Sequence, residues 1–175
     1  MLYYYKSKEL SEEKTSSFED IVNCYEKRVH GFIYNMVRNS EAAEDLTQEV
    51  FIRVYEKFYK YNPEYAIEPW LFKIAYNLTL NYLKKNKNRN KEVSIEEYND
   101  KGINASDPIQ EFETKYMLLR EIDSFKQESK AIFLLKIMED LSFEQIALML
   151  GTSTAAVRLK FYRNRKVLIE RLNRT

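Results

Sequence analysis

The chain has 175 residues, and its 28 Lys and Arg residues against 27 Asp and Glu residues leave a formal net charge of +1. Only three glycines, three prolines, one cysteine and one histidine are present. This composition excludes a Gly-rich phosphate loop and a Cys/His zinc site or iron–sulfur cluster, and it disfavours turn-rich β sandwiches and barrels. No acid/base or metal-ligating constellation stands out. We therefore expect an all-α protein that is not an enzyme and uses no cofactor or metal.

Three features of the sequence indicate the cellular compartment of the protein. The N-terminus, MLYYYKSKELSEEK, lacks the basic start and apolar core of a secretory signal. No apolar run approaches the length of about 18 residues that spans a bilayer. The single cysteine, Cys24, cannot form an internal disulfide. We expect a cytoplasmic protein without membrane insertion.

The small net charge is the sum of strongly charged blocks. Residues 69–91 sum to +6, residues 92–113 to −6 and residues 158–175 to +6. The acidic block contains Gly102 and Pro108 and has weak hydrophobic periodicity, which is typical of a linker. We predict two small helical domains joined by a flexible acidic linker. In chain order, the tail, first domain, linker and second domain occupy residues 1–17, 18–91, 92–111 and 112–175.

The first domain shows three helical patterns. Apolar residues recur every three or four positions from Phe18 to Val37, as on the buried stripe of an amphipathic helix. Ser40 is placed to cap a second helix, which ends before Pro63. Pro69 suits the first turn of a third helix that runs into a cluster of cations ending at Arg89.

The second domain ends in a tight helical unit. Two helices are predicted first, from Phe112 to Phe125 and from Glu128 to Met138. Ser142 is then placed to cap a short helix, Gly151 to break it, and Ser153 to cap a last helix. A helix, a short Gly-containing turn and a second helix form the helix-turn-helix pattern.

The last helix carries a candidate DNA-binding face. Val157 and Phe161, four residues apart, are expected to pack inward and to turn the opposite face outward. A major groove admits such a helix, and its cations then meet phosphates. A solvated basic face is the alternative explanation for the charges. The outward residues and flanking cations are Thr154, Ala155, Arg158, Lys160, Tyr162, Arg163 and Arg165.

An aromatic-rich segment leads into the basic helix of the first domain. Aromatic faces beside cations suit single-stranded DNA, where stacking contributes about 1–3 kcal/mol per base. The alternative is that most of these rings are core residues, as we expect for Trp70. Tyr61 and Tyr65, close to Pro63, are the better candidates for exposure. The rings are Tyr55, Phe58, Tyr59, Tyr61, Tyr65, Trp70, Phe72 and Tyr76.

A polar face is predicted on the second helix, in the run DLTQEVF. Leu46 and Val50 are expected to face the core, which turns the polar side of the helix outward. Such a face suits a basic partner, although exposed helix acids are commonly only solvated. The outward residues are Asp45, Gln48, Glu49 and Ile52.

Three runs together resemble bacterial sigma factors of the small two-domain, extracytoplasmic-function type. They are DLTQEVFIRVYEKF, WLFKIAYNLTLNYLKK and LSFEQIALMLGTSTAAVRLKFYRNRKVL, and they occur in the order of that family. The resemblance covers about residues 18–90 and 112–172. It implies a subunit that binds core RNA polymerase and directs promoter-specific transcription initiation by recognising the minus-ten and minus-thirty-five elements.

The resemblance also implies roles for residues. Asp45, Gln48, Glu49 and Ile52 would contact the clamp helices of the β′ subunit of polymerase. The last domain would read the minus-thirty-five element through the outward residues of its final helix and touch the β flap. An anti-sigma factor is a further implied partner. The loop and basic helix of the first domain would open and read the minus-ten element through Asn62, Tyr65, Lys73, Asn77, Asn81, Lys84 and Lys85.

A free-standing helix-turn-helix regulator is the alternative function. It explains the C-terminal unit but gives no role to the DLTQE face or to the aromatic-basic helix. Dependence on core polymerase separates the two, because a sigma factor is expected to bind promoter DNA specifically only with the core enzyme.

Overall fold

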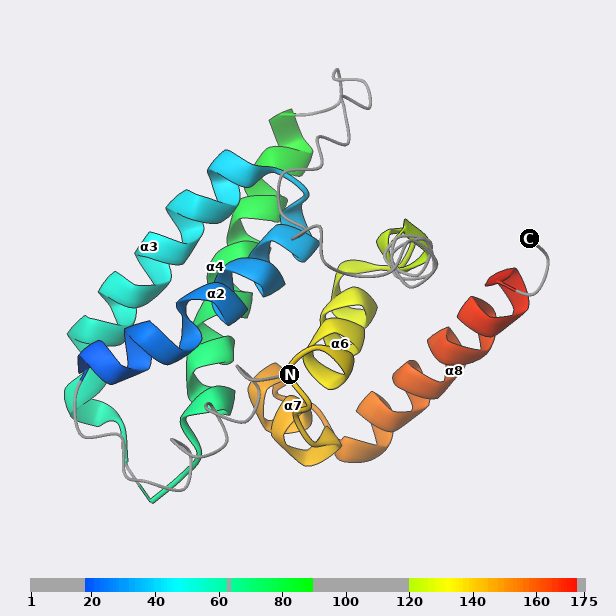
Figure 1. Cartoon of the computed structure of the whole chain (residues 1–175). Coiled ribbons are helices and arrows are strands. Elements are labelled where there is room, and N and C mark those ends of the chain that lie inside the picture. Colours follow the sequence, from blue (N-terminus) through cyan, green and yellow to red (C-terminus); the bar gives the residue numbers. More distant parts are fainter. Residues whose placement is uncertain (1–17, 63, 90–119, 173–175) are drawn as a thin grey trace, which may run out of the picture.

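The described residues of the computed structural model, 18–62, 64–89 and 120–172, form helices and short connections, in agreement with the predicted all-α class (Figure 1). The predicted tail and acidic linker lie outside these residues, as does most of the predicted helix from Phe112 to Phe125. The N-terminal unit consists of α2 (Phe18–Val37), α3 (Ser40–Lys57), the 3-10 helix η1 (Phe58–Lys60) and α4 (Ile67–Arg89). The C-terminal unit consists of α6 (Gln127–Ile137), α7 (Phe143–Leu150) and α8 (Thr154–Leu172).

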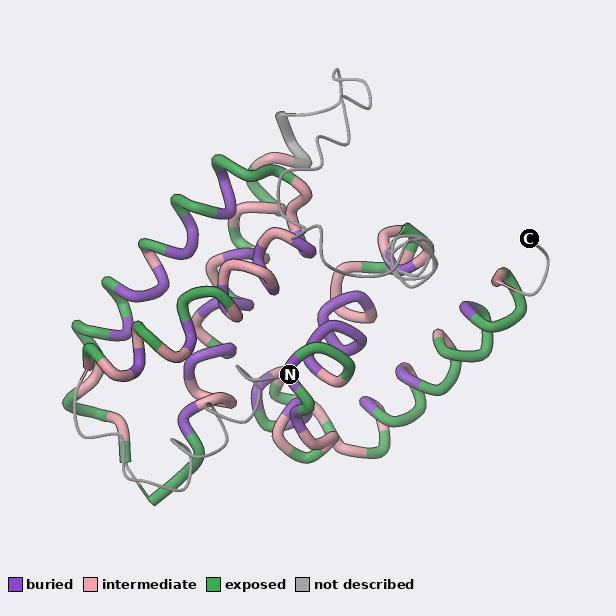
Figure 2. Tube along the Cα trace, viewed as in Figure 1, coloured by how far each residue is buried: buried purple, intermediate pink, exposed green. Residues whose placement is uncertain are grey.

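The N-terminal unit is a three-helix packing of α2, α3 and α4, in which each helix contacts the other two. The apolar stripe predicted for α2 is buried, with Val29 and Phe32 fully inaccessible. Phe32 meets Phe72 of α4 edge-on, with ring centroids 5.6 Å apart. The buried sides of the helices face one another, and the remaining sides face solvent (Figure 2).

The turn between α2 and α3 corrects one prediction. Arg38 adopts a positive φ of 55° and ends α2. Asn39 is the N-cap of α3, because its side-chain oxygen accepts a hydrogen bond of 2.8 Å from the N–H of Ala42. Ser40, predicted as the cap, is instead the first residue of the helix, and its hydroxyl lies 3.4 Å from Glu44. Asn is as good a cap as Ser, and the choice depends on where the backbone turns.

The helix-turn-helix of the C-terminal unit forms as predicted. The Ser142 hydroxyl accepts a hydrogen bond from the N–H of Gln145, whose side chain accepts one from the N–H of Ser142, a complete capping box. Gly151 ends α7 in the left-handed conformation, with φ 65°, which glycine adopts without a Cβ clash. Ser153 then accepts a hydrogen bond of 3.2 Å from the N–H of Ala156 at the start of α8.

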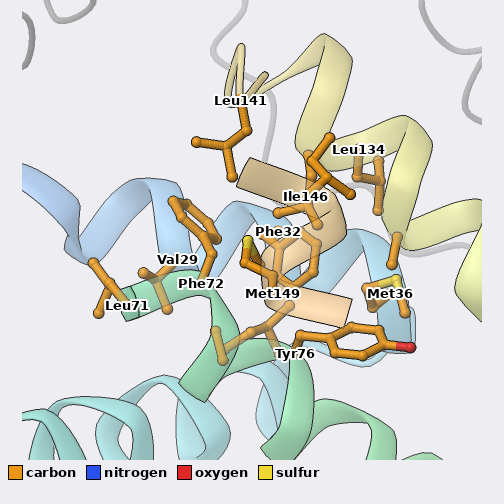
Figure 3. Packing of buried hydrophobic residues seen from close by; sticks show 14 of the residues in the cluster. Val29, Phe32, Met36, Leu71, Phe72, Tyr76, Leu134, Leu141, Ile146 and Met149 are labelled. Atoms are coloured by element: carbon orange, nitrogen blue, oxygen red, sulfur yellow. The ribbon is translucent and has the colours of Figure 1, made fainter. Parts of the chain in front are cut away.

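The two units pack against each other. Helix α6 lies on α2 and α7 lies on α4, so that one hydrophobic cluster continues from one unit into the other. We call this contact the seam. Figure 3 shows its apolar side chains meeting. They are Phe32 and Met36 of α2, Phe72 and Tyr76 of α4, Leu134 of α6, Ile146 and Met149 of α7, and Leu141 between α6 and α7.

Charged groups are also buried at the seam. Arg28 of α2 forms an ion pair of 2.8 Å with Glu139, whose side chain is only 4% exposed. Asp123 pairs with both Arg38 and Lys130, and the Lys130 ammonium also donates to the Met36 carbonyl at 3.3 Å. Burial raises the pKa of Glu139 and lowers that of Lys130, while their ionic partners oppose both changes.

None of the helices in the described part of the chain is long and apolar enough to cross a membrane.

The cap of α3 generates the first prediction. Asn39→Ala is expected to lower the free energy of unfolding by about 1 kcal/mol, because the N–H of Ala42 loses its acceptor. Urea denaturation followed by circular dichroism measures the change. The matched control is Ser40→Ala, which removes only a long, exposed hydroxyl contact and is expected to change stability by about 0.5 kcal/mol or less. A larger loss for Ser40→Ala than for Asn39→Ala would contradict the observed cap.

Candidate nucleic-acid and polymerase interfaces

A solvent-facing row of polar side chains runs along α4. Lys73, Asn77 and Asn81 follow one another at intervals of four residues and are all exposed, as are Lys84 and Lys85. Residues four apart lie on the same helix face. The opposite face of α4 is buried in the core and the seam, so this row lies on the side of α4 that a partner can contact. Amides and cations along one helix suit base edges and phosphates.

The connection before α4 is held by its own hydrogen bonds. The Tyr61 hydroxyl donates to the Tyr65 carbonyl at 2.6 Å, and the Asn62 side chain accepts from the N–H of Glu64 at 3.0 Å. Tyr61 is half-buried between Phe58 and Trp70, at centroid distances of 6.0 and 5.5 Å. Burial raises the pKa of Tyr61, and the negative charge of Glu68 raises it further.

The Tyr65 side chain is left 71% exposed by this arrangement, in the connection that leads into α4. Its backbone is fixed by the Tyr61 hydroxyl and by a hydrogen bond of 3.1 Å from its N–H to the Asn62 carbonyl. An exposed ring on a fixed backbone is a suitable platform for stacking on an unpaired base.

The start of α4 is anchored from α2. The buried Tyr25 hydroxyl donates to Glu68 at 2.8 Å, and the Arg28 guanidinium lies 4.9 Å from the centre of the Tyr25 ring. Burial and the neighbouring carboxylate raise the pKa of Tyr25 above its ordinary value. The phenol therefore stays protonated and remains a donor to Glu68. This contact positions the connection that carries Tyr65.

The DLTQE face of α3 points outward as predicted. Asp45 and Gln48 are exposed, and Ile52 is 59% exposed. Glu49 is partly exposed and forms an ion pair of 2.8 Å with Arg53 one turn later. Leu46 and Val50 lie in the core.

Gln48 lies between two open grooves. One, of about 440 Å³, is largely apolar and runs between α2 and α3. The other, of about 520 Å³, is more polar and includes His30 and Glu44. An apolar groove bordered by exposed acids and an amide is suited to bind a partner helix that has both apolar and basic residues. The apolar groove is lined chiefly by Phe18, Val22, Phe51, Ile52 and Tyr55.

Helix α8 is seated by aromatic packing. Val157 and Phe161 are buried, and Phe161 stacks on Phe133 of α6 at 4.7 Å and meets Phe143 of α7 at 5.3 Å. This packing leaves the other side of α8 exposed to solvent. Ala155, Arg158, Tyr162, Arg163 and Arg165 are exposed and Thr154 is half-buried.

Two cations of α8 are paired with carboxylates inside the unit. Arg158 lies 2.9 Å from Glu144 and over the Phe143 ring, and Lys160 lies 2.6 Å from Glu128. The pKa of Glu144 is lowered, chiefly because its carboxylate accepts a hydrogen bond from the backbone N–H of the same residue. Arg158 therefore faces a charged carboxylate. Such exposed pairs are weak and exchange readily for phosphates. Lys160 lies on the side of α8 next to α6 rather than on its outward face.

Two sequence families match the chain. Sigma-70 region 2 matches residues 21–89, and sigma-70 region 4 matches residues 116–168. The RNA polymerase sigma factor CarQ of Myxococcus xanthus is 31% identical over 156 residues, which is 89% of this chain and 89% of the relative. The chain belongs to the ECF-type sigma factors.

A second sigma factor relative is longer than this chain. The ECF RNA polymerase sigma factor SigE of Mycolicibacterium smegmatis is 32% identical over 155 residues, 87% of this chain, and the match spans 60% of the relative's length. Sigma factors of this type direct RNA polymerase to promoters and are not themselves enzymes. The alternative of a free-standing regulator is therefore set aside.

Two solved structures share the fold. RpoE of Bartonella quintana, in complex with the anti-sigma factor NepR, is similar with a TM-score of 0.75 at 17% identity, over 89% of this chain and 96% of that one. CnrH, in complex with the cytosolic domain of CnrY, is similar with a TM-score of 0.67 at 15% identity, over 95% of this chain and 94% of that one. At these identities the likeness concerns fold alone.

The predicted site residues of the sigma factor lie on three separate surfaces: on α3, on α4 with the connection before it, and on α8.

Several of the candidate rings are not available to DNA. Phe72 and Tyr76 are buried in the core and seam, and Tyr61 and Trp70 are half-buried against each other. Tyr65, Tyr55 and Tyr59 are exposed. Within the described residues, no group of three or more His, Cys, Asp or Glu side chains is arranged to hold a metal.

Sequence reasoning missed the charged groups of the seam. The run AIFLLKI contains five successive apolar residues, which is typical of a helix buried on more than one side. This was a usable signal that α6 packs against a second partner. Nothing in the pattern identified Arg28 as the partner of Glu139, which lies 111 residues away.

The anchor of α4 generates the second prediction. Tyr25→Phe is expected to lower the free energy of unfolding by about 1.5–3 kcal/mol, because the half-buried Glu68 carboxylate loses a hydrogen-bond donor. Chemical denaturation measures the loss. Tyr59→Phe, at a ring that is 79% exposed, is the matched control and is expected to change little. Equal stability of the two variants would show that the Tyr25 hydroxyl does not anchor the helix.

Proposed function

We propose that this sigma factor binds core RNA polymerase through α3 and reads two promoter elements through α4 and α8. It does so in the cytoplasm, where polymerase works. The N-terminal domain, residues 18–91, binds polymerase and reads the minus-ten element. The C-terminal domain, residues 112–175, reads the minus-thirty-five element, and residues 92–111 join the two.

The polymerase-binding surface consists of Asp45, Gln48, Glu49 and Ile52. Its expected partner is the pair of clamp helices of the β′ subunit. The exposure of Ile52 together with Tyr55 in the lining of the apolar groove supports this, because a contiguous exposed apolar patch is typical of a protein-binding site. The acids of the same face suit cations at the edge of the partner.

The minus-ten element is read by α4 and the connection before it. Asn62 and Tyr65 lie at the entrance, followed by the row of Lys73, Asn77 and Asn81 and then Lys84 and Lys85. One observation carries this assignment: α4 carries an exposed polar row, and the connection leading into α4 presents the exposed Tyr65 ring on a backbone that the Tyr61 hydroxyl holds. A base leaving the duplex could stack on this ring while cations hold its phosphates.

The minus-thirty-five element is read by α8. Thr154, Ala155 and Arg158 occupy its first turns, where a helix in the major groove meets base edges. Tyr162, Arg163 and Arg165 follow toward the backbone, and Lys160 lies at the flank. We further propose that this domain touches the β flap of polymerase.

An anti-sigma factor is a further proposed partner. Two structures similar in fold are complexes, one of the sigma factor RpoE with the anti-sigma factor NepR and one of CnrH with the cytosolic domain of CnrY. The open grooves beside Gln48 offer such a protein a binding surface that overlaps the proposed polymerase contact.

The dependence of promoter binding on core polymerase tests the proposed function directly. Fluorescence anisotropy with a labelled promoter duplex is measured with the chain alone, with core polymerase alone and with both. At one fixed salt concentration, binding that discriminates between promoter and scrambled duplex is expected only with both. Tight, sequence-specific binding by the chain alone would instead support a free-standing regulator.

The α3 surface generates the third prediction. Gln48→Ala combined with Ile52→Ala is expected to weaken binding to core polymerase about ten-fold or more, because a central amide and apolar anchor are lost. Lys57→Ala, an exposed change at the end of the same helix and away from the face of Gln48 and Ile52, is the control. Binding is measured by biolayer interferometry with immobilised core enzyme. Unchanged affinity of the double variant would refute the assignment.

The α8 surface generates the fourth prediction. Arg158→Ala is expected to reduce transcription from promoters with an intact upstream element by about 5- to 100-fold, since a bidentate base contact contributes about 1–3 kcal/mol. Promoters with a scrambled upstream element are expected to change little. Lys166→Ala, an exposed cation on the same helix, is the control. An equal decrease in transcription from both promoter types would show that Arg158 contacts phosphates and not bases.

A further inference from the structure

The outward face of α8 is not uniformly cationic. Leu159 is 51% exposed and Tyr162 is 55% exposed, on the side of the helix away from the buried Val157 and Phe161. Ala155, one turn before Leu159, is exposed as well. Single exposed apolar residues are common on protein surfaces. These three, however, follow one another at intervals of four and three residues and so form one continuous line, which we call the apolar stripe.

Cations border the apolar stripe on both sides. At about 100° per residue, Arg163 projects about 40° to one side of Leu159, and Arg158 and Arg165 project about 100° and 120° to the other. All three arginines are exposed. The major groove of a DNA duplex has base edges along its floor and phosphates along both rims. Apolar side chains between cations on a helix match this arrangement.

Packing within the C-terminal unit directs the neighbours of Leu159 and leaves Leu159 uncovered. The Arg158 guanidinium lies 2.9 Å from Glu144 and 5.6 Å from the centre of the Phe143 ring, so this side chain extends toward α7. The Tyr162 ring contacts the Phe143 ring at a centroid distance of 6.0 Å, which fixes its direction. Leu159 is therefore free to contact a partner.

The thymine methyl group is the apolar feature that the floor of the major groove offers. The base edges present hydrogen-bond donors and acceptors there, and thymine adds a C5 methyl group. A Leu side chain has no donor or acceptor and gains free energy only by removing apolar surface from water. Over a guanine it would take water from N7 and O6 without replacing the hydrogen bonds. Leu159 is therefore suited to thymine.

We propose that Leu159 is a specificity-determining residue that contacts the C5 methyl group of a thymine in the upstream promoter element. Ala155 and Tyr162 border this methyl group, and the flanking arginines hold phosphates and neighbouring base edges. This inference rests on the proposed function, because it assumes that α8 lies in the major groove of that element. It requires that the element contains at least one A·T base pair.

Removal of a single methyl group from the DNA tests the contact. The probe is deoxyuridine, which pairs as thymine does and lacks only the C5 methyl group. Each thymine of the upstream element, on either strand, is replaced singly in a promoter identified by its mapped start site. The affinity of the chain bound to core polymerase is measured by fluorescence anisotropy at one fixed salt concentration. We expect about 3- to 5-fold weaker binding at one position, as for the burial of one methyl-sized group.

Variants of α8 identify the residue that reads the methyl group. With Leu159→Ala, thymine and deoxyuridine promoters are expected to bind equally well, because the apolar partner is lost. Leu159→Met keeps an apolar side chain of similar volume and is expected to retain the preference for thymine. Val167→Ala is the matched control, an apolar truncation at a residue of α8 that is 37% exposed and lies outside the stripe. It is expected to retain the full preference. Circular dichroism of each variant confirms retained helicity.

Four results would overturn the inference. They are equal binding of all deoxyuridine promoters by the wild-type chain on core polymerase, an upstream element without an A·T base pair, a thymine preference that Leu159→Ala leaves unchanged, and a preference that Val167→Ala abolishes equally. A loss of affinity with Leu159→Ala that is the same on both promoters, with the preference unchanged, would assign the apolar stripe to a protein contact.

Scrambling the whole upstream element separates the two proposals. If scrambling weakens binding and deoxyuridine does not, the methyl contact fails and the proposed function of α8 stands. If scrambling has no effect, α8 does not read the element, and both fail.

Discussion

The packing of α6 and α7 on α2 and α4 is the contact on which the rest of the structure depends. It joins the cores of the two units into one hydrophobic cluster around Phe32 and Phe72. Because α4 buries one side in its own unit and in the seam, the row that begins at Lys73 is left exposed on its other side. The same constraint orients α8, whose Phe161 is held between α6 and α7. The positions of the surfaces assigned to DNA therefore follow from what the core buries.

Charge is distributed so that a nearly neutral chain offers two cationic surfaces. The blocks of +6 at residues 69–91 and 158–175 are balanced by the acidic residues between them and elsewhere in the chain. On α8, Arg158 and Lys160 rest against carboxylates of α7 and α6 in the free chain. Phosphates can replace these partners, and the binding is then sensitive to salt. A net charge of +1 is consequently no argument against a nucleic-acid partner.

Much of the fold and of the site was predictable because local rules determine it. Helical periodicity identified the buried faces of α2 and α8, and cap residues together with Gly151 identified the helix-turn-helix. The outward direction of Gln48 and Ile52 followed from the inward direction of Leu46 and Val50. Sequence spacing could equally place Asn39 or Ser40 at the cap of α3, and only the backbone turn at Arg38 decides between them.

The seam was not predictable in the same way. Periodicity shows that a helix face is buried but does not show against which helix, so Phe72 and Tyr76 could be read either as core or as exposed rings. The pairing of Arg28 with Glu139 depends on how the two units pack, which no local pattern encodes. The features that were missed are those that join distant parts of the chain.

Start-site mapping by run-off transcription tests the central claim most directly, that this chain gives core polymerase its promoter specificity. Fragments of genomic DNA are transcribed with core polymerase alone and with core polymerase plus the chain, and the 5′ ends of the transcripts are sequenced. The account predicts discrete start sites that appear only when the chain is added and that share two sequence elements at fixed spacing. The same start sites with core polymerase alone, or no discrete sites with both, would contradict it.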